Sequence, residues 1–227
     1  MILSVHLART GPRDAVSVLR RRLAPDGVPG LIWAQAAVTV PLAAGVLPPP
    51  RPTGVGLIAA WSGDEALDDF LERDPSARRL AGGWHVRLQP LRASGSWTAL
   101  PGLAEPEQPV DDDEPVAVVT LGRLRPRRAV AFLRTTAPAE REAVADPALV
   151  LSTALARPPQ LVATFSVWDT AAAMRSYAYG SAVAAHVRAI RAHRARPFHH
   201  ESVFARFRPY AARGAWRGTR ALVADAP

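Results

Sequence analysis

Apolar and polar residues alternate with two periods along the chain, one typical of strands and one typical of amphipathic helices. In the first half this pattern predicts strands at residues 2–8, 31–40, 55–61 and 84–91, and helices at 12–23 and 64–80. In the second half it predicts strands at 116–121, 148–156, 161–168 and 201–208, a helix from Pro126 and a long helix at 170–194. Each half therefore has the order βαββαβ, which is the ferredoxin-like unit.

Short blocks of sequence recur in the same order in both halves. Residues 5–20 align without a gap on residues 119–134, and nine positions are identical between them, among them Arg9 and Arg123. Later blocks recur around Trp61 and Trp168, and again before Trp97 and Trp216. Recurrence of this kind indicates internal duplication. We therefore expect an α+β fold in which two tandem ferredoxin-like repeats form an intramolecular α/β barrel.

Three segments follow from this alignment. Residues 1–100 form the first repeat, residues 101–115 form an acidic, proline-rich linker that we expect to be solvated, and residues 116–227 form the second repeat. An uncharged stretch at residues 27–50 is long enough to span a bilayer, but its prolines and glycines make it a poor membrane helix. It is interpreted as a buried strand followed by an apolar loop, with a lipid-facing entrance and peripheral membrane contact as the alternative.

Charge is divided unequally between the two halves. The net charge is +8, and all 28 basic residues are Arg. Residues 1–115 hold 11 Arg against 14 acidic residues, a net charge of −3, whereas residues 116–227 hold 17 Arg against 6, a net charge of +11. The second half is thus the place for an anionic cofactor or an acidic partner. Nucleic acid is the weaker interpretation, because lysine and an RNA-binding strand motif are both missing.

The absence of cysteine removes whole classes of chemistry. A chain with no Cys forms no disulfide, no thiolate zinc site and no iron–sulfur cluster, so any metal must be held by His, carboxylate or hydroxyl groups. Nucleotide-binding glycine loops and the hydrolase nucleophile elbow are also missing. The N-terminus lacks the pattern of a secretory signal peptide, which favours a cytoplasmic protein.

Several runs in the second half resemble a known family. They are Ala163-Thr164-Phe165-Ser166-Val167-Trp168-Asp169, Met174-Arg175-Ser176-Tyr177, His186-Val187-Arg188, Phe204-Ala205-Arg206-Phe207 and Gly214-Ala215-Trp216. Their order and spacing resemble the spheroidene monooxygenase family of carotenoid ketolases, within the haem-binding ferredoxin-like (dimeric α/β barrel) superfamily. The match covers about residues 116–218, and the first half departs from the family pattern.

The resemblance implies an oxidoreductase that binds haem b in its second repeat. Such an enzyme inserts oxygen into a hydrophobic small molecule, either a carotenoid or another secondary metabolite, with electrons from an external donor such as a ferredoxin. A haem-free barrel that binds a lipophilic ligand, or that catalyses a cofactor-free step, is the alternative. Either form is compatible with a monomer or a homodimer.

With cysteine absent, a haem needs His or Tyr as its axial ligand. His186 lies in the predicted helix 170–194 with apolar residues one turn away on either side, and His193 follows two turns later on the same face. In the resembled superfamily the ligand commonly comes from this helix, so we expect His186 to bind the iron and His193 to lie near the cofactor. A structural role for His186, with a hydrogen bond to the backbone, stays open. The pair His199-His200 is the second candidate, with a loop role favoured.

Two further candidates lie on strands. Arg206 alternates with Phe204 and Arg208 on one face of the last strand. If the opposite, apolar face packs under the helices, Arg206 points into the barrel, where it can pair with a haem propionate or orient oxygen. A structural pairing with acids, as for its repeat equivalent Arg87, is the other interpretation. His6 lies on the polar face of the first strand and is a candidate distal group near the substrate, or else a histidine at the barrel rim.

Overall fold

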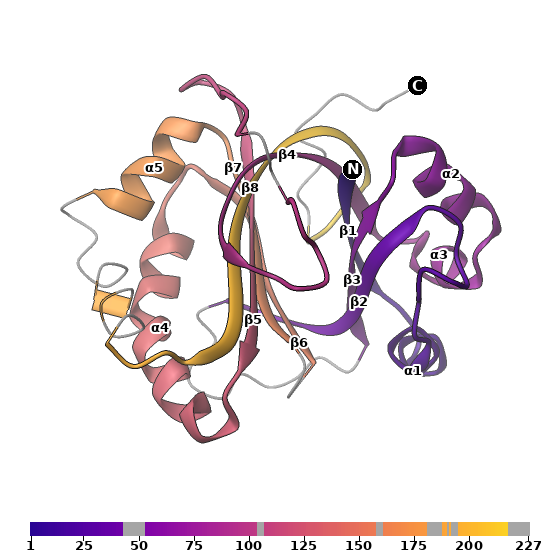
Figure 1. The fold of residues 1–227 in the computed structure, drawn as a ribbon, viewed down its shortest axis with the longest axis horizontal. Coiled ribbons are helices and arrows are strands. Elements are labelled where there is room, and N and C mark those ends of the chain that lie inside the picture. The colour runs from indigo at the N-terminus through magenta and orange to yellow at the C-terminus, as the bar shows by residue number, and fades with distance from the viewer. Residues whose placement is uncertain are drawn as a thin grey trace.

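Eight antiparallel strands close into a barrel in the computed structural model of the chain (Figure 1). The structure describes residues 1–42, 53–103, 107–157, 161–180, 188–189, 191 and 195–217. The strands are β1 (Ile2–Arg9), β2 (Leu31–Val40), β3 (Gly54–Trp61), β4 (Trp84–Ser96), β5 (Val116–Leu124), β6 (Leu149–Arg157), β7 (Leu161–Trp168) and β8 (His199–Gly214). The helices are α1 (Pro12–Arg20), α2 (Asp64–Arg73), α3 (Pro75–Leu80), the short 3₁₀ helix η1 (Pro126–Arg128), α4 (Ala129–Ala145) and α5 (Ala171–Tyr179).

The two halves contribute equivalent arcs of strands to the barrel. The first half runs β4-β1-β3-β2 and the second runs β8-β5-β7-β6, and the arcs join where β2 pairs with β6 and β4 pairs with β8. The expected α+β barrel is therefore confirmed. That the halves are repeats of one unit, and that the chain divides into residues 1–100, 101–115 and 116–227, stay predictions.

Apolar side chains fill the inside of the barrel. Leu3, Val5 and Leu7 of β1 belong to a buried cluster that also contains Phe165 of β7 and Phe207 of β8. Successive residues of a strand point to opposite faces, so the residues between them face the helices outside. Both faces of most strands are therefore covered, and in β3 every residue is buried.

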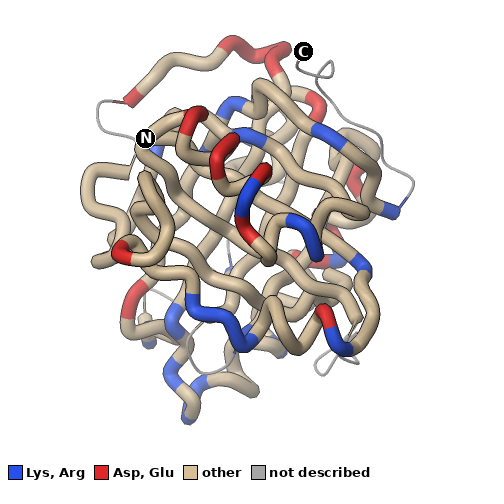
Figure 2. The backbone as a smooth tube through the Cα atoms, turned by 90° about the vertical axis from the view of Figure 1, so that its right-hand side faces the viewer, with Lys and Arg blue, Asp and Glu red and all other residues tan. Residues whose placement is uncertain are grey.

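Helices lie outside the barrel in two separate layers. Helices α1, α2 and α3 cover the first half, on the right of Figure 1, and α4 and α5 flank the second half on the left. Residues from α1, α2 and α3 form one apolar cluster with β3, including Trp61, Leu67 and Phe70. Figure 2 faces this layer and shows acidic and basic residues intermixed over it. The cluster beneath α5 is smaller and centres on Trp168 and Met174.

Two predicted helices are shorter in the structure for local reasons. The helix expected at 64–80 divides at Asp74, whose carboxylate accepts a hydrogen bond from the backbone of Ser76 (2.7 Å), while Pro75 begins α3. The helix expected at 170–194 is wrong as a continuous element, because α5 ends at Tyr179. Gly180 is extended, and a Cβ there would lie 2.3 Å from the carbonyl oxygen of Ser176.

The connection between the halves makes contacts with both of them. The carboxylate of Glu114 accepts a hydrogen bond from Arg208 Nε (2.8 Å), and its carbonyl oxygen accepts one from the backbone of Ala171 at the start of α5 (2.7 Å). The backbone of Gln108 donates to the carbonyl oxygen of Leu91 (2.8 Å). Residues 107–109 and 111–113 are nevertheless exposed, so these contacts do not contradict a solvated linker, and the linker assignment stays a prediction.

The strand predicted in the uncharged stretch is β2, which pairs with β3 and β6. The apolar loop expected after it falls mostly at residues 43–52, outside the described residues. Among the described residues, no helix has the length and hydropathy needed to cross a membrane.

Candidate functional site

Arg206 lies on the helix side of β8. Val203, Ala205 and Phe207 belong to the cluster inside the barrel, so the face that Arg206 shares with Phe204 turns outward toward α5. The prediction that Arg206 points into the barrel is wrong. The prediction assumed that the apolar face of β8 packs under the helices. Both faces of β8 are covered, and the apolar face packs inside the barrel instead.

The guanidinium of Arg206 is buried without an acidic partner in the described chain. The residue is only 8% exposed, and its Nη2 donates a hydrogen bond to Tyr179 Oη (2.6 Å) at the end of α5. Its Nε is buried and has no hydrogen-bond partner among the described residues. Arg208, two residues later on the same face, is bound instead to Glu114. A buried charge without a counter-ion is costly, and the arrangement favours an anionic group beside Arg206.

His6 lies in the other helix layer, between β1 and α2. It is 2% exposed, its Nε2 lies 3.0 Å from Ser4 Oγ, and its ring contacts the edge of Phe70. The His6 ring also stacks on His85, with 5.2 Å between centroids. Burial, followed by the nearby charges of His85 and Arg87, lowers the pKa of His6 to about 3. His6 is therefore neutral at physiological pH.

The structure does not bring His6 and Arg206 together. His6 faces α2 in the first half, whereas Arg206 faces α5 in the second. Sequence reasoning placed His6 either near the substrate or at the barrel rim, but its side chain is enclosed in a packed network. Trp61 Nε1 donates to Ser4 Oγ (2.8 Å), the oxygen that His6 also contacts. His6 as a distal catalytic group therefore has no geometric support beside Arg206.

Arg87 of β4, the counterpart of Arg206 in the first half, is paired structurally. Its Nη1 donates to Asp64 Oδ1 (2.6 Å), and its Nη2 is bound to Asp68, both on α2. Tyr210 of β8 also donates to Asp64 (2.8 Å). The alternative of a structural ion pair therefore applies to Arg87, and the two equivalent arginines have different surroundings.

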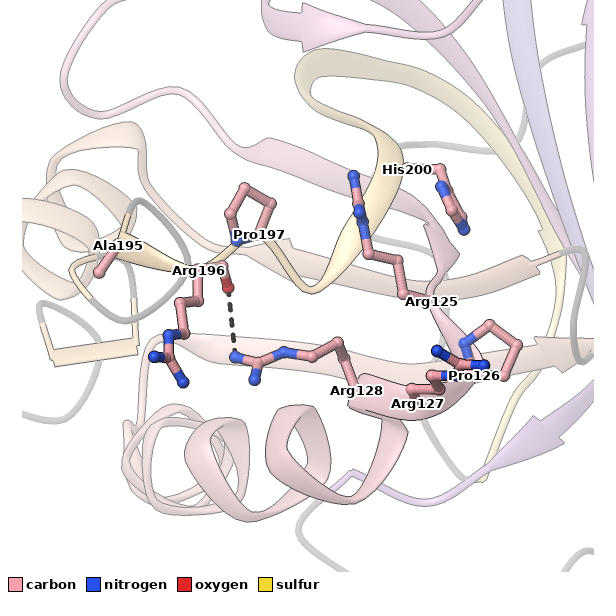
Figure 3. Close-up of a pocket in the computed structure, with 8 residues that line it drawn as sticks. All are labelled: Arg125, Pro126, Arg127, Arg128, Ala195, Arg196, Pro197 and His200. Carbon is pink, nitrogen blue, oxygen red and sulfur yellow. Dashed lines mark hydrogen bonds between the residues drawn. The ribbon is translucent and has the colours of Figure 1, made fainter.

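A basic pocket of about 660 Å³ opens at the other end of β8 (Figure 3). It lies between the segment around η1 and the residues that lead into β8. Its walls are Arg125, Pro126, Arg127, Arg128, Ala195, Arg196, Pro197 and His200. His200, part of the second candidate pair, thus lines a pocket, while His199 packs on Gly122 and against the ring of Phe132. Sequence reasoning missed this pocket, although the density of arginines at 123–128 was a signal.

The first candidate ligands, His186 and His193, lie outside the described residues. The segment that carries them begins just after Tyr179, the residue that contacts Arg206. Within the described ranges, no three His or acidic side chains gather as a metal site would require. The partnership of Arg206 with Tyr179 was also missed, because Tyr179 is 27 residues away in sequence and is 64% exposed.

Comparison with known proteins finds several with similar sequences. No protein-family model matches the chain. The spheroidene monooxygenase of Rubrivivax gelatinosus is 35% identical over 179 residues, which are 75% of this chain and 66% of that protein. The chain is a homologue of the spheroidene monooxygenases. The enzyme of that name from Rhodobacter capsulatus is 33% identical over 135 residues, 59% of this chain and 55% of that protein.

The resemblance to the spheroidene monooxygenases is thereby confirmed, whereas haem binding and the superfamily stay predictions. The chain spans between about half and two thirds of the length of these relatives. Among solved structures, an aldoxime dehydratase aligns at a TM-score of 0.49 with 10% identity, covering 92% of this chain and 78% of the other. An anthrone oxidase-like protein aligns at 0.37 with 13% identity, covering 99% and 96%. Both similarities are distant, and the architecture rests on the strand pairing described above.

Proposed function

We propose that the chain is an oxidoreductase of the monooxygenase type that acts on a hydrophobic polyene, with haem b bound in its second half. The homology to spheroidene monooxygenases supports the reaction class and the carotenoid-like substrate. The observation that supports this position for the haem is Arg206, a buried guanidinium without a described acidic partner. The first half has no equivalent, because Arg87 is bound to two carboxylates.

The residues around Arg206 fit the anionic edge of a haem. A propionate is a carboxylate, and a guanidinium with an unpartnered Nε can bind it with the geometry and charge that a buried Arg requires. Tyr179 Oη accepts from Arg206 Nη2 and so holds the guanidinium in place, with its own hydroxyl proton left to donate. Phe204 on the same strand face adds an apolar surface. These groups would position the cofactor edge.

His186 is the proposed axial ligand, and His193 is proposed to lie near the cofactor. Both belong to the segment that follows Tyr179. Haem, when bound, would supply the redox-active iron that oxygen insertion into an unactivated substrate requires, with electrons from an external donor such as a ferredoxin. The contribution of this chain would be the hydrophobic environment, the binding of the propionate by Arg206 and the control of proton access by Tyr179.

Haemin titration of the purified chain tests the cofactor. We expect a Soret band that saturates at one haem per chain, and we expect His186→Ala to lose the band or shift it. His193→Ala should retain the band, and so should His200→Ala, since loss of the band in His200→Ala would assign the iron to the second candidate pair. A chain that stays colourless with excess haemin would overturn haem binding and favour the haem-free barrel.

Conversion of a carotenoid tests the reaction separately. The chain is expressed in cells that accumulate spheroidene, and the pigments are separated and weighed by mass spectrometry. We expect a product with added oxygen that depends on the chain and is lost in Arg206→Gln. A pigment profile identical to that of cells without the chain would contradict the proposed reaction, whatever the haem titration shows.

A further inference from the structure

The basic pocket lies apart from the site proposed around Arg206. His200 on its wall and Arg206 are six residues apart on the same strand, which is about 20 Å of extended chain. The pocket therefore requires its own explanation. Its charge, the hydrogen bonds that hold its arginines and its volume each indicate a class of ligand. All of its lining residues belong to the described chain.

The positive charge of the pocket is uncompensated. Four arginines line it and no acidic residue does. In the described part of the chain, none of these four arginines forms an ion pair with a carboxylate, whereas Arg123 nearby is paired with Glu201 (3.4 Å). Glu201 is next in sequence to His200, but it is also bound to the backbone of Thr98. The nearest acid along the strand is therefore already occupied.

Two of the guanidinium groups are fixed in place by backbone carbonyls. Arg125 Nε donates to the carbonyl oxygen of His199 (3.1 Å), and Arg128 Nη2 donates to that of Arg196 (3.5 Å), as Figure 3 shows for the latter pair. The guanidinium of Arg128 also lies over the ring of Phe198, 5.4 Å from its centroid. Side chains held this way lose little entropy when a ligand binds, so the pocket is preorganised.

The remaining guanidinium N–H groups fit a group with several anionic oxygens. Guanidinium groups bind phosphate with paired hydrogen bonds, and several converging arginines match a multiply charged oxyanion better than a single carboxylate. A volume of about 660 Å³ is typical of small-molecule sites and exceeds the size of a phosphate ion. Pro126, Pro197 and Ala195 supply apolar wall for the rest of the ligand.

We propose that this pocket binds the phosphate group of a ligand with an uncharged or apolar body, with Arg125 and Arg128 as fixed anchors and Arg127 and Arg196 completing the site. Two sources share this chemistry, a free phosphate or diphosphate ester and the headgroup of an anionic lipid. The site does not depend on the proposed oxygenase reaction.

The test compares two double variants of equal charge. Arg127→Gln with Arg196→Gln removes two pocket guanidiniums without removing the anchors Arg125 and Arg128. Arg134→Gln with Arg141→Gln removes two exposed arginines from α4, outside the pocket, and is the matched control. Binding is measured by calorimetry with pyrophosphate, and by co-sedimentation with phosphatidylcholine vesicles that do or do not contain phosphatidic acid.

We expect saturable binding of pyrophosphate, of phosphatidic acid vesicles, or of both, weakened about tenfold or more in the pocket variant and unchanged in the control. Pyrophosphate alone would assign a free ester, and vesicles alone would assign a lipid headgroup. Absence of binding to both probes would overturn the proposal, as would equal weakening in the two double variants. Displacement of pyrophosphate by haemin would also overturn it, because the pocket would then serve the carboxylates of the cofactor.

Discussion

The two helix layers of the barrel differ in how they bury apolar side chains and pair charges. In the first half, three short helices cover β3 with a continuous apolar cluster around Trp61 and Phe70. Several charges in this layer are paired within it, as in the pair of Arg21 with Asp74 (2.7 Å). In the second half the apolar cluster is smaller, and the buried Arg206 and the basic pocket have no described acidic partners.

The contrast is sharpest between Arg87 and Arg206. Each lies on the last strand of its half and faces a helix, but α2 presents two aspartates to Arg87, whereas α5 presents the hydroxyl of Tyr179 to Arg206. Carboxylates complete a structural ion pair. A hydroxyl orients a guanidinium and leaves its charge available. The residues of the covering helix therefore decide whether the equivalent arginine forms an ion pair with carboxylates or a hydrogen bond with a hydroxyl.

The largest expected effect concerns the packing of the two layers. Trp61→Ala should lower the free energy of unfolding by about 3–5 kcal/mol, because Trp61 is fully buried in the larger cluster and leaves a cavity. Trp168→Ala should cost less, since its cluster is smaller. Urea denaturation of both variants measures the difference. Equal losses would contradict the view that the first layer is the better packed.

The pH dependence of stability should come from the first layer. His6 is neutral in the folded protein, with its pKa lowered to about 3, whereas in the unfolded chain it binds a proton near pH 6.5. The unfolded state therefore binds more protons below that pH, and stability is lost as pH falls. We expect a loss of up to about 1.4 kcal/mol per pH unit below the unfolded pKa.

His6→Gln should reduce this dependence between about pH 6.5 and pH 5, above the range in which carboxylates protonate, and the rest should come from His85, whose pKa is also lowered by burial. His200→Gln, an exposed histidine of the second half, should leave the slope unchanged. Thermal unfolding followed across this interval provides the measurement. A wild-type protein whose stability is constant over the interval would show that His6 is not enclosed as described.

A smaller difference in stability is expected when the serine that accepts a hydrogen bond from the buried tryptophan of each layer is removed. Ser4 is buried and contacts both Trp61 Nε1 and His6, so Ser4→Ala leaves two buried polar groups without this partner. We expect a loss of about 2 kcal/mol. Ser166 accepts from Trp168 Nε1 (3.1 Å) but is half-buried, so water can replace it, and Ser166→Ala should cost about 0.5 kcal/mol. Chemical denaturation of the two variants tests the order.

The sequence predicts the strands of the barrel well because strand periodicity is a local signal. It assigns the direction of Arg206 wrongly, because alternation separates the two faces of β8 but does not say which is inside when both are covered. The basic pocket depends on the approach of residues 125–128 to residues 195–200, a long-range contact with no pattern of its own. The end of α5 before Gly180 has only that one glycine as a signal in the sequence.

The central claim is that the chemistry lies in the second layer at Arg206 and not at its structural counterpart. The most direct measurement is the rate of carotenoid oxygenation by Arg206→Gln beside that of Arg87→Gln, each at matched folded protein. We predict a loss of about 100-fold or more for Arg206→Gln, with stability unchanged or increased. For Arg87→Gln we predict a retained rate, with about 1–2 kcal/mol of stability lost. A full rate in Arg206→Gln, or an equal loss of rate in both variants, would contradict the account.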